Sequence, residues 1–429
     1  MVSCKYTVYL QYLLLLNVVD ACRIIAFAGH EPISGRRLLL ETENSLPELA
    51  YDRPFLPALE HSSNWNAQQC GMRNAHENRD GWGVGWYPTD SEFSFPLRFR
   101  TMESIVSDVN STSPTFYDIL DGNHEISLIN EAKETSGLFE HSQGFLENSV
   151  SVGSCGTETK QTPKLPLESR VVFGHVRKAT SNINDENAHP FVFNHLLFMH
   201  NGMLADFELY QDILLRRLRP AVRGMLQGGV DSEHAGALFC NNLEGFPKRR
   251  DYSMAEMRGA MRTMIAELRA LSAEASLHQC HKIHHSIISE INETSIPSGK
   301  MKSWSPSSMN FAVSDGQGII VTRFRSKDDE DPPSLYYKLG VESYVSNKDK
   351  EDTSSVNNNN NHKRSFSVDG LVVASEPLEE SGPDLSKWRL LGKDKMISYH
   401  PNEGVKIECL SHQCTSDTPA DVDLFTTDC

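Results

Sequence analysis

The feature that most constrains the fold is the order of the apolar segments along the chain. Short apolar runs typical of strands occupy both ends, whereas segments with helical spacing lie between them. The expected strands are Arg23–Gly29, Trp82–Tyr87, Arg170–Val176, Phe191–His200, a hairpin over Met309–Phe324 and Leu371–Leu378. The expected helices are Leu204–Leu218 and the stretch that Ser253 and Glu256 open as a capping box. This order favours a layered α+β domain over most of the chain.

Composition excludes several classes of function. The chain has 429 residues, of which 39% are hydrophobic and 23% charged, as in a globular protein with a large core. The formal net charge of -16, with no basic stripe, argues against a nucleic-acid partner. The nine cysteines are scattered and form no C-x-x-C pair, which favours a reducing compartment and at most one reactive thiol.

Residues 1–21 have the outline of a signal peptide. Lys5 precedes an apolar run, and Val19 and Ala21 are small residues directly before Cys22. The run is too short for a membrane span. Cleavage after Ala21 would leave Cys22 as the first residue, and the alternative is an unstructured extension or a mis-assigned first exon.

Two polar stretches, near 118–166 and 340–366, interrupt the apolar pattern, and we expect both to be surface insertions. The predicted organisation is therefore a leader at 1–21, one domain at 22–408 that carries both insertions, and a flexible tail at 409–429.

Cys22 would carry its own base if it were the amino-terminal residue. An α-amine has an unperturbed pKa of about 8 and can accept the thiol proton near neutral pH. The thiolate would then attack an amide carbonyl, and water or an amine would resolve the thioester. Taken alone, Cys22 is better explained as a small buried apolar residue.

Three polar motifs could complete such a site. "HNG" offers the Asn201 amide and the Gly202 N–H as donors to an oxyanion, although Asn-Gly is also a common turn. "GHVRKAT" offers Arg177 for a carboxylate and Thr180 as a hydroxyl donor. "DSE" offers Asp231 for an ammonium group. Each motif alone is also explained by a surface ion pair or a helix cap.

In this order the motifs resemble the class II glutamine amidotransferases of the N-terminal-nucleophile hydrolase superfamily. The matching segments are "CRIIAF" at 22, "NRDGWGVGWY" at 78, "GHVRKAT" at 174, "NAHPF" at 187, "FMHNG" at 198 and "DSE" at 231. Three later segments look like the amidotransferase subunit of the fungal-type glutathione-degradation complex: "MNFAVSDG" at 309, "PPSLYY" at 332 and "VVASEPL" at 372. The resemblance covers roughly residues 22–116 and 170–408.

The resemblance implies an αββα four-layer sandwich of two antiparallel sheets, the N-terminal-nucleophile hydrolase fold. It also implies that Cys22 is the nucleophile and that Asn201 and Gly202 form the oxyanion hole. Family members usually begin Met-Cys, whereas here 21 residues precede the cysteine. The amine base therefore exists only if the chain is cut between Ala21 and Cys22.

The resemblance also assigns substrate-binding residues. Arg177 would bind the α-carboxylate of a glutamyl group, with Thr180 beside it, and Asp231 would bind the α-ammonium. Trp82 and His189 would line the pocket. Glutamine and glutathione share every atom recognised in this way, so the motifs cannot separate them, and only the resemblance favours glutathione.

The remaining expectations concern ligands, partners and location. The resemblance implies no cofactor and a metallopeptidase-like partner subunit, and we expect no membrane partner. His281 and His285 share a helix face, but with no partner carboxylates we expect a solvated helix end and not a metal site. Cysteine usage and the resemblance favour the cytoplasm, with secretion as the alternative if residues 1–21 are a signal peptide. The alternative function is a non-catalytic ligand-binding or regulatory subunit with Cys22 unexposed.

Overall fold

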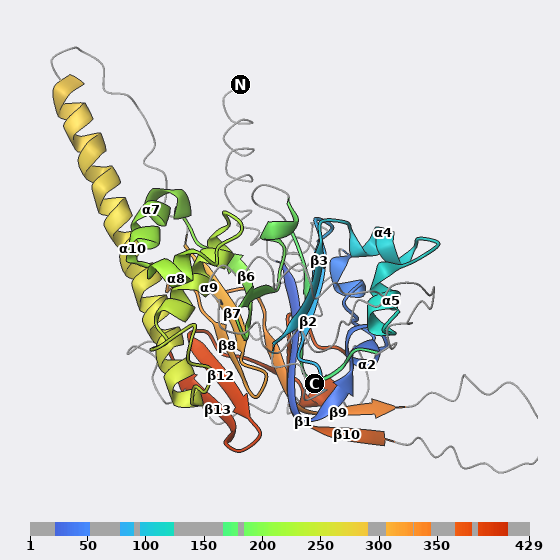
Figure 1. Cartoon of the computed structure of the whole chain (residues 1–429). Coiled ribbons are helices and arrows are strands. Elements are labelled where there is room, and N and C mark those ends of the chain that lie inside the picture. Colours follow the sequence, from blue (N-terminus) through green and yellow to red (C-terminus); the bar gives the residue numbers. More distant parts are fainter. Residues whose placement is uncertain are drawn as a thin grey trace, which may run out of the picture.

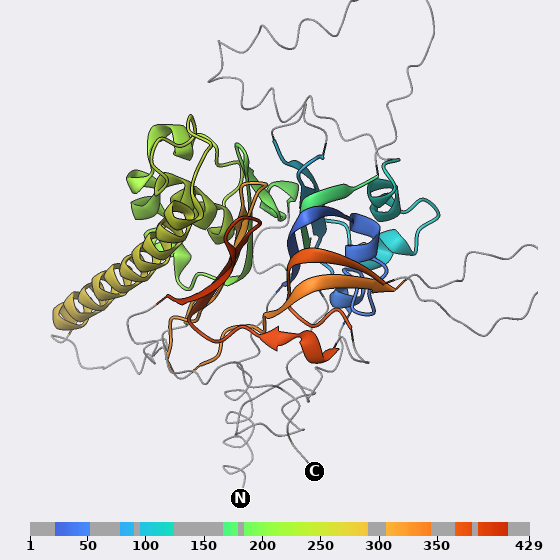
Figure 2. The same ribbon diagram turned by 90° about the horizontal axis from the view of Figure 1, so that it is seen from below.

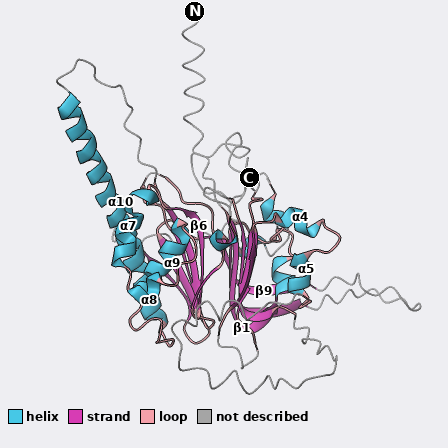
Figure 3. Cartoon of the chain, turned by 45° about the horizontal axis from the view of Figure 1, so that its top comes forward, coloured by secondary structure: helices cyan, strands magenta, loops and turns pink. Residues whose placement is uncertain are grey.

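The computed structural model describes residues 22–51, 78–89, 95–123, 166–178, 184–290, 306–328, 330–344, 365–379 and 385–410. Two antiparallel sheets face each other at its centre, and one group of helices covers the outer face of each sheet (Figures 1 and 3). The predicted αββα four-layer sandwich is confirmed. No helix of the described segments combines the length and apolarity needed to cross a bilayer.

The first sheet has seven strands in the order β11-β9-β10-β1-β4-β2-β3. In chain order these are β1 (Arg23–Ser34), β2 (Trp82–Trp86), β3 (Leu97–Thr101), β4 (Glu168–Val176), β9 (Tyr336–Tyr344), β10 (Ser365–Ala374) and β11 (Arg389–Leu390). β1 is the central strand: Arg23 pairs with Val176 of β4, and Ile25 pairs with Ala374 of β10. Cys22 therefore stands at the end of the central strand.

The second sheet has six strands in the order β13-β12-β8-β7-β6-β5. In chain order these are β5 (Phe191–Phe193), β6 (Leu196–Met203), β7 (Ser308–Ser314), β8 (Ile319–Arg323), β12 (Lys395–His400) and β13 (Gly404–Cys409). The hairpin expected over Met309–Phe324 is formed by β7 and β8. The single strand expected over Phe191–His200 is wrong, because Asn194 has a left-handed φ of 57° and folds the segment into the β5–β6 hairpin.

The helices fall into two groups on opposite sides of the sheets (Figure 2). Beside the first sheet lie α2 (Gly35–Leu39), α4 (Ile105–Val109) and α5 (Thr115–Leu120). Beside the second sheet lie α7 (Phe207–Arg217), α8 (Pro220–Arg223), α9 (Asp231–Asn241) and α10 (Met254–Glu290). Short 3-10 turns are η1 (Glu48–Ala50), η4 (Asp185–Asn187) and η6 (Leu385–Lys387).

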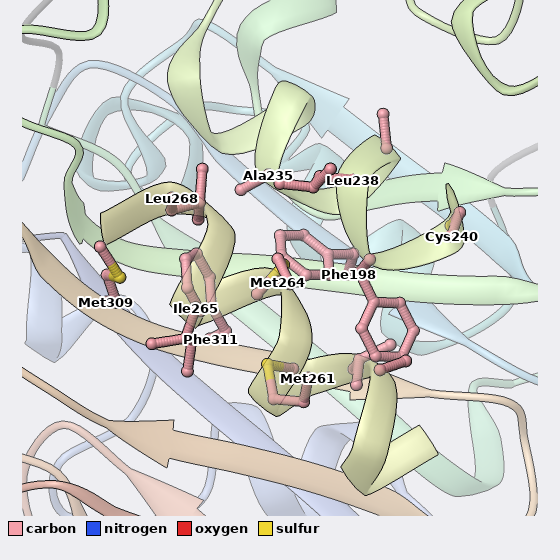
Figure 4. Close-up of a cluster of buried hydrophobic side chains, with 14 of the residues drawn as sticks. Phe198, Ala235, Leu238, Cys240, Met261, Met264, Ile265, Leu268, Met309 and Phe311 are labelled. Carbon is pink, nitrogen blue, oxygen red and sulfur yellow. The ribbon is translucent and has the colours of Figure 1, made fainter. Parts of the chain in front are cut away.

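The start of α10 and its apolar stripe form as predicted. Ser253 Oγ accepts from the Glu256 N–H, and the Glu256 carboxylate accepts from the Ser253 N–H, which completes the capping box. Met261 and Met264 are fully buried in a cluster with Phe198 and other side chains of β6, β7 and α9 (Figure 4). The methionine stripe of α10 is therefore core packing that fixes the helix on the second sheet.

Several predictions concern residues outside the described segments. These are the leader at 1–21, the larger parts of both insertions, Thr180 and the tail beyond 410. The predicted domain organisation stays a prediction.

Candidate active site

Cys22 faces the space between the two sheets. Ile24, Ala26 and Ala28 of β1 pack in the cluster between the sheets, and the alternation of a strand gives Cys22 the same direction. Its side chain is 9% exposed, and Sγ accepts a hydrogen bond from the Lys178 N–H at 3.4 Å. The thiol therefore lies where β1 begins and β4 ends.

Burial dominates the electrostatics of this thiol and raises the pKa of Cys22. The Lys178 N–H and the charges of Arg177 and Arg23 act against that rise, whereas the Asp231 carboxylate adds to it. With a raised pKa the thiol is protonated at neutral pH, so a nucleophilic Cys22 needs a base beside it. A free α-amine on the same residue would be such a base.

Arg177 follows β4 on the same face and is 4% exposed. Its guanidinium donates to Met102 Sδ at 3.3 Å, and it forms no ion pair with any residue that the structure describes. Burial lowers the pKa of Arg177, and the negative charge available at Cys22, Asp80 and Asp231 opposes that change. A buried guanidinium with unused donors can bind an anion, which would compensate its desolvation.

Asp231 is the first residue of α9 and is partly buried. Its Oδ1 accepts from the Ser232 N–H at 2.8 Å, and its Oδ2 accepts from the Leu204 N–H at 2.7 Å. Within the described part of the chain no cation pairs with it. The two backbone donors hold the carboxylate in place and leave lone pairs on both oxygens that an ammonium group can use.

Asn201 and Gly202 lie near the end of β6, on the sheet opposite Cys22. The Asn201 side chain is fully buried; its Nδ2 donates to Ser375 Oγ at 3.3 Å, while its Oδ1 has no partner in the described segments. A Cβ at Gly202 would collide with the Ser308 carbonyl oxygen on the neighbouring strand. Glycine is therefore required by the close approach of β7, whatever its part in chemistry.

His189 lies beneath this site, stacked on His175 with ring centroids 4.1 Å apart. The segment that carries it crosses the inner face of β2, where a Cβ at Gly83 would collide with the His189 carbonyl oxygen. Burial lowers the pKa of His175 to about 3 and lowers the pKa of His189 well below its usual range; the Arg177 charge adds to both shifts. Both rings are therefore neutral at pH 7.

Trp82 is not brought into this group. Its ring lies 4.9 Å from Phe99 and 5.2 Å from Phe116, in the cluster on the outer face of the first sheet. The alternation in "WGVGW" is the cause, since Gly83 and Gly85 take the inner positions and the tryptophans the outer ones. The prediction that the Trp82 side chain lines the pocket does not fit this placement, because the ring lies on the face of the first sheet opposite Cys22.

The charges of Arg177 and Asp231 act on the Cys22 thiol, and the charge of Arg177 also acts on His189. Asn201, with Gly202 next to it in the chain, is linked to the start of β1 through Ser375, which bonds to Ile24. Sequence reasoning missed two members of this region, His175 and Ser375. His175 lies two residues before Arg177, so the alternation of a strand predicts that both side chains point to the same face. Ser375 had no such signal. No group of three or more His, Cys, Asp or Glu side chains in the described segments could hold a metal ion.

The buried histidines predict a specific acid sensitivity of the fold. The folded-state pKa of His175 is about 3, against about 6.5 when unfolded, so the unfolded chain binds the proton first. Stability is therefore lost as the pH falls below 6.5, by roughly 2 kcal/mol from this group between pH 6.5 and 4.5. Denaturant unfolding of the wild type and His175→Gln at both pH values measures this, and the variant should show the smaller decrease. Equal decreases would contradict the buried neutral state.

Comparisons with known proteins bear on the family of this chain. The sequence model of the family "Glutamine amidotransferases class-II" matches residues 137–279. "Probable glutamine amidotransferase DUG3" of Saccharomyces cerevisiae is 26% identical over 365 residues, which cover 83% of this chain and 76% of the yeast protein.

Two solved structures are also similar. A glutamine aminotransferase class-II domain protein from Silicibacter pomeroyi has 18% identity and a TM-score of 0.41, with 91% of this chain and 100% of that chain covered. The glutamine phosphoribosylpyrophosphate amidotransferase from B. subtilis has 12% identity and a TM-score of 0.41, with 91% and 50% covered.

Proposed function

Because the chain belongs to the class II glutamine amidotransferases, as a distant homologue of the yeast protein DUG3, we propose that it hydrolyses a γ-glutamyl amide bond with Cys22 as nucleophile. One observation carries the proposal: a buried Arg177 without an ion-pair partner among the described residues lies near both the Cys22 thiol and the Asp231 carboxylate. Such a site holds two opposite charges that do not neutralise each other.

A glutamyl group supplies the missing partners. Its α-carboxylate fits the planar fork of Arg177, and its α-ammonium fits Asp231. Folding has already removed both side-chain charges partly from water, so these two contacts need little further desolvation or ordering of the protein. The γ-amide then extends from the charged end of the substrate toward the thiol.

The reaction proceeds in two halves. The α-amine of Cys22 takes the thiol proton, Sγ attacks the γ-carbonyl carbon, and the new oxyanion is stabilised by Asn201 Nδ2 and the Gly202 N–H. The protonated amine passes its proton to the leaving nitrogen as the C–N bond breaks, which leaves a thioester. Water then attacks the thioester with the same amine as base, releasing glutamate and the free thiol. This mechanism requires cleavage of the chain between Ala21 and Cys22, because only then does Cys22 carry a free α-amine.

The proposal also covers the leaving group, the partner subunit and the cellular location. With glutamine the product beside glutamate is ammonia, and with glutathione it is cysteinylglycine. The resemblance of the three C-terminal motifs to the fungal-type glutathione-degradation subunit supports glutathione, a metallopeptidase-like partner that would cleave cysteinylglycine, and the cytoplasm.

The test combines the mature amino terminus with activity. We expect mass spectrometry of the protein from its native source to find Cys22 as the first residue, and that material to release glutamate from glutathione or glutamine. An intact leader without glutamate release would instead support a non-catalytic subunit that keeps the pocket for a ligand. Binding of glutamate to such material, measured by calorimetry, would identify that second function.

A further inference from the structure

Ser375 connects the two sheets at the site. It follows β10 in the motif "VVASEPL" and is 1% exposed. The nucleophile stands on one sheet and the oxyanion donors on the other, so no strand ladder fixes Cys22 relative to Asn201. Their relative position has to come from contacts between side chains and backbone across the two layers.

Three hydrogen bonds of Ser375 provide such contacts. Its N–H donates to the Ile24 carbonyl at 3.0 Å, and its Oγ accepts from the Ile24 N–H at 3.0 Å. The same Oγ accepts from Asn201 Nδ2 at 3.3 Å. One hydroxyl thus joins the second residue after Cys22 to the side chain of the oxyanion residue.

The donors and acceptors of the Ser375 hydroxyl and the Asn201 amide show what their contact can fix. A hydroxyl oxygen has two acceptor positions, and here the Ile24 N–H and Asn201 Nδ2 occupy both. Nδ2 carries two hydrogens, so one is held by Ser375 and the other stays available for a ligand. The Ser375 O–H has no acceptor among the described residues, so it can also donate to Oδ1 of a rotated amide. The contact therefore fixes the place of the Asn201 amide relative to β1, not which end of the amide faces the substrate.

We propose that Ser375 is a positioning residue that holds the Asn201 amide next to β1 and so sets the distance between the oxyanion hole and the β1 nucleophile. The inference rests on the proposed function and deepens it. It gives a role in the mechanism to a residue of the "VVASEPL" motif, which otherwise only supports the resemblance to the glutathione-degradation subunit. Ser375 acts through Asn201 and does not itself touch the substrate.

The experiment compares Ser375→Ala, Asn201→Ala and the double variant in the purified, mature protein. Removing an oxyanion donor costs about 10²- to 10³-fold in kcat, and displacing that donor without removing it should cost about tenfold to a hundredfold. We therefore expect Ser375→Ala to lower kcat by that smaller factor, with the inhibition constant of L-glutamate unchanged within about twofold. The double variant should be no slower than Asn201→Ala alone.

Ser169→Ala is the matched control. Ser169 is also a buried serine on the first sheet whose Oγ accepts a backbone N–H, that of Tyr87 at 3.1 Å, but it lies at the end of β4 away from Arg177. It should lose a similar amount of thermal stability and keep its kcat.

Three results would overturn the inference. In the first, Ser375→Ala keeps the wild-type kcat. In the second, the fold-decrease in kcat of the double variant equals the product of the fold-decreases of Ser375→Ala and Asn201→Ala. In the third, Ser169→Ala lowers kcat as much as Ser375→Ala does. A wild-type protein that releases no glutamate from either substrate refutes the proposed function itself, and this inference with it.

Discussion

Cys22→Ala is expected to lower glutamate release by about 10⁴- to 10⁶-fold, the range seen when a covalent nucleophile is removed. The reason is chemical, since alanine can form no thioester and the remaining donors only bind the substrate. The measurement is glutamate production from glutathione and from glutamine under saturating conditions. Binding of L-glutamate should persist, because Arg177 and Asp231 are untouched.

The chain supplies a matched control in Cys240, the other free cysteine of the described segments. It lies in the last turn of α9 and is 1% exposed, and burial raises its pKa well above the usual range. Cys240→Ala should therefore cost stability through lost packing and leave kcat unchanged. If Cys22→Ala kept full activity, Cys22 would not be the nucleophile and the proposed mechanism would be wrong.

Arg177→Met is expected to lower kcat/KM by about 30- to 3,000-fold while making the empty protein more stable. The loss follows because a buried charge partner of the substrate carboxylate is worth roughly 2–5 kcal/mol. The gain in stability follows because Arg177 is desolvated without a carboxylate partner among the described residues, a cost that an apolar side chain avoids. Opposite changes in function and stability are typical of a binding site.

Arg219→Met separates this effect from a general consequence of losing an arginine. The Arg219 guanidinium donates to the carbonyl oxygens of Cys240, Asn241, Leu243 and Phe246, so it fixes the chain after α9. Its removal leaves carbonyls without a donor and should lower the melting temperature with little change in KM. If Arg177→Met also lowered the melting temperature and kept KM, Arg177 would be a structural residue.

The sequence determined the elements and the chemical groups of this protein. Alternation and helical spacing, together with caps, are properties of one segment, so β1, the β7–β8 hairpin and the methionine face of α10 were all predictable. The resemblance added the layered fold and the identities of Cys22 and Arg177 as candidates.

The tertiary structure decided how those groups are oriented and paired. It turned Trp82 to the outer face and let His189 cross Gly83, and it left Arg177 without an ion-pair partner in the described segments. It also joined Ser375 to Asn201 across two sheets. The physical reason is that these relations depend on packing between segments far apart in sequence, whereas local patterns report only which face of a segment is apolar.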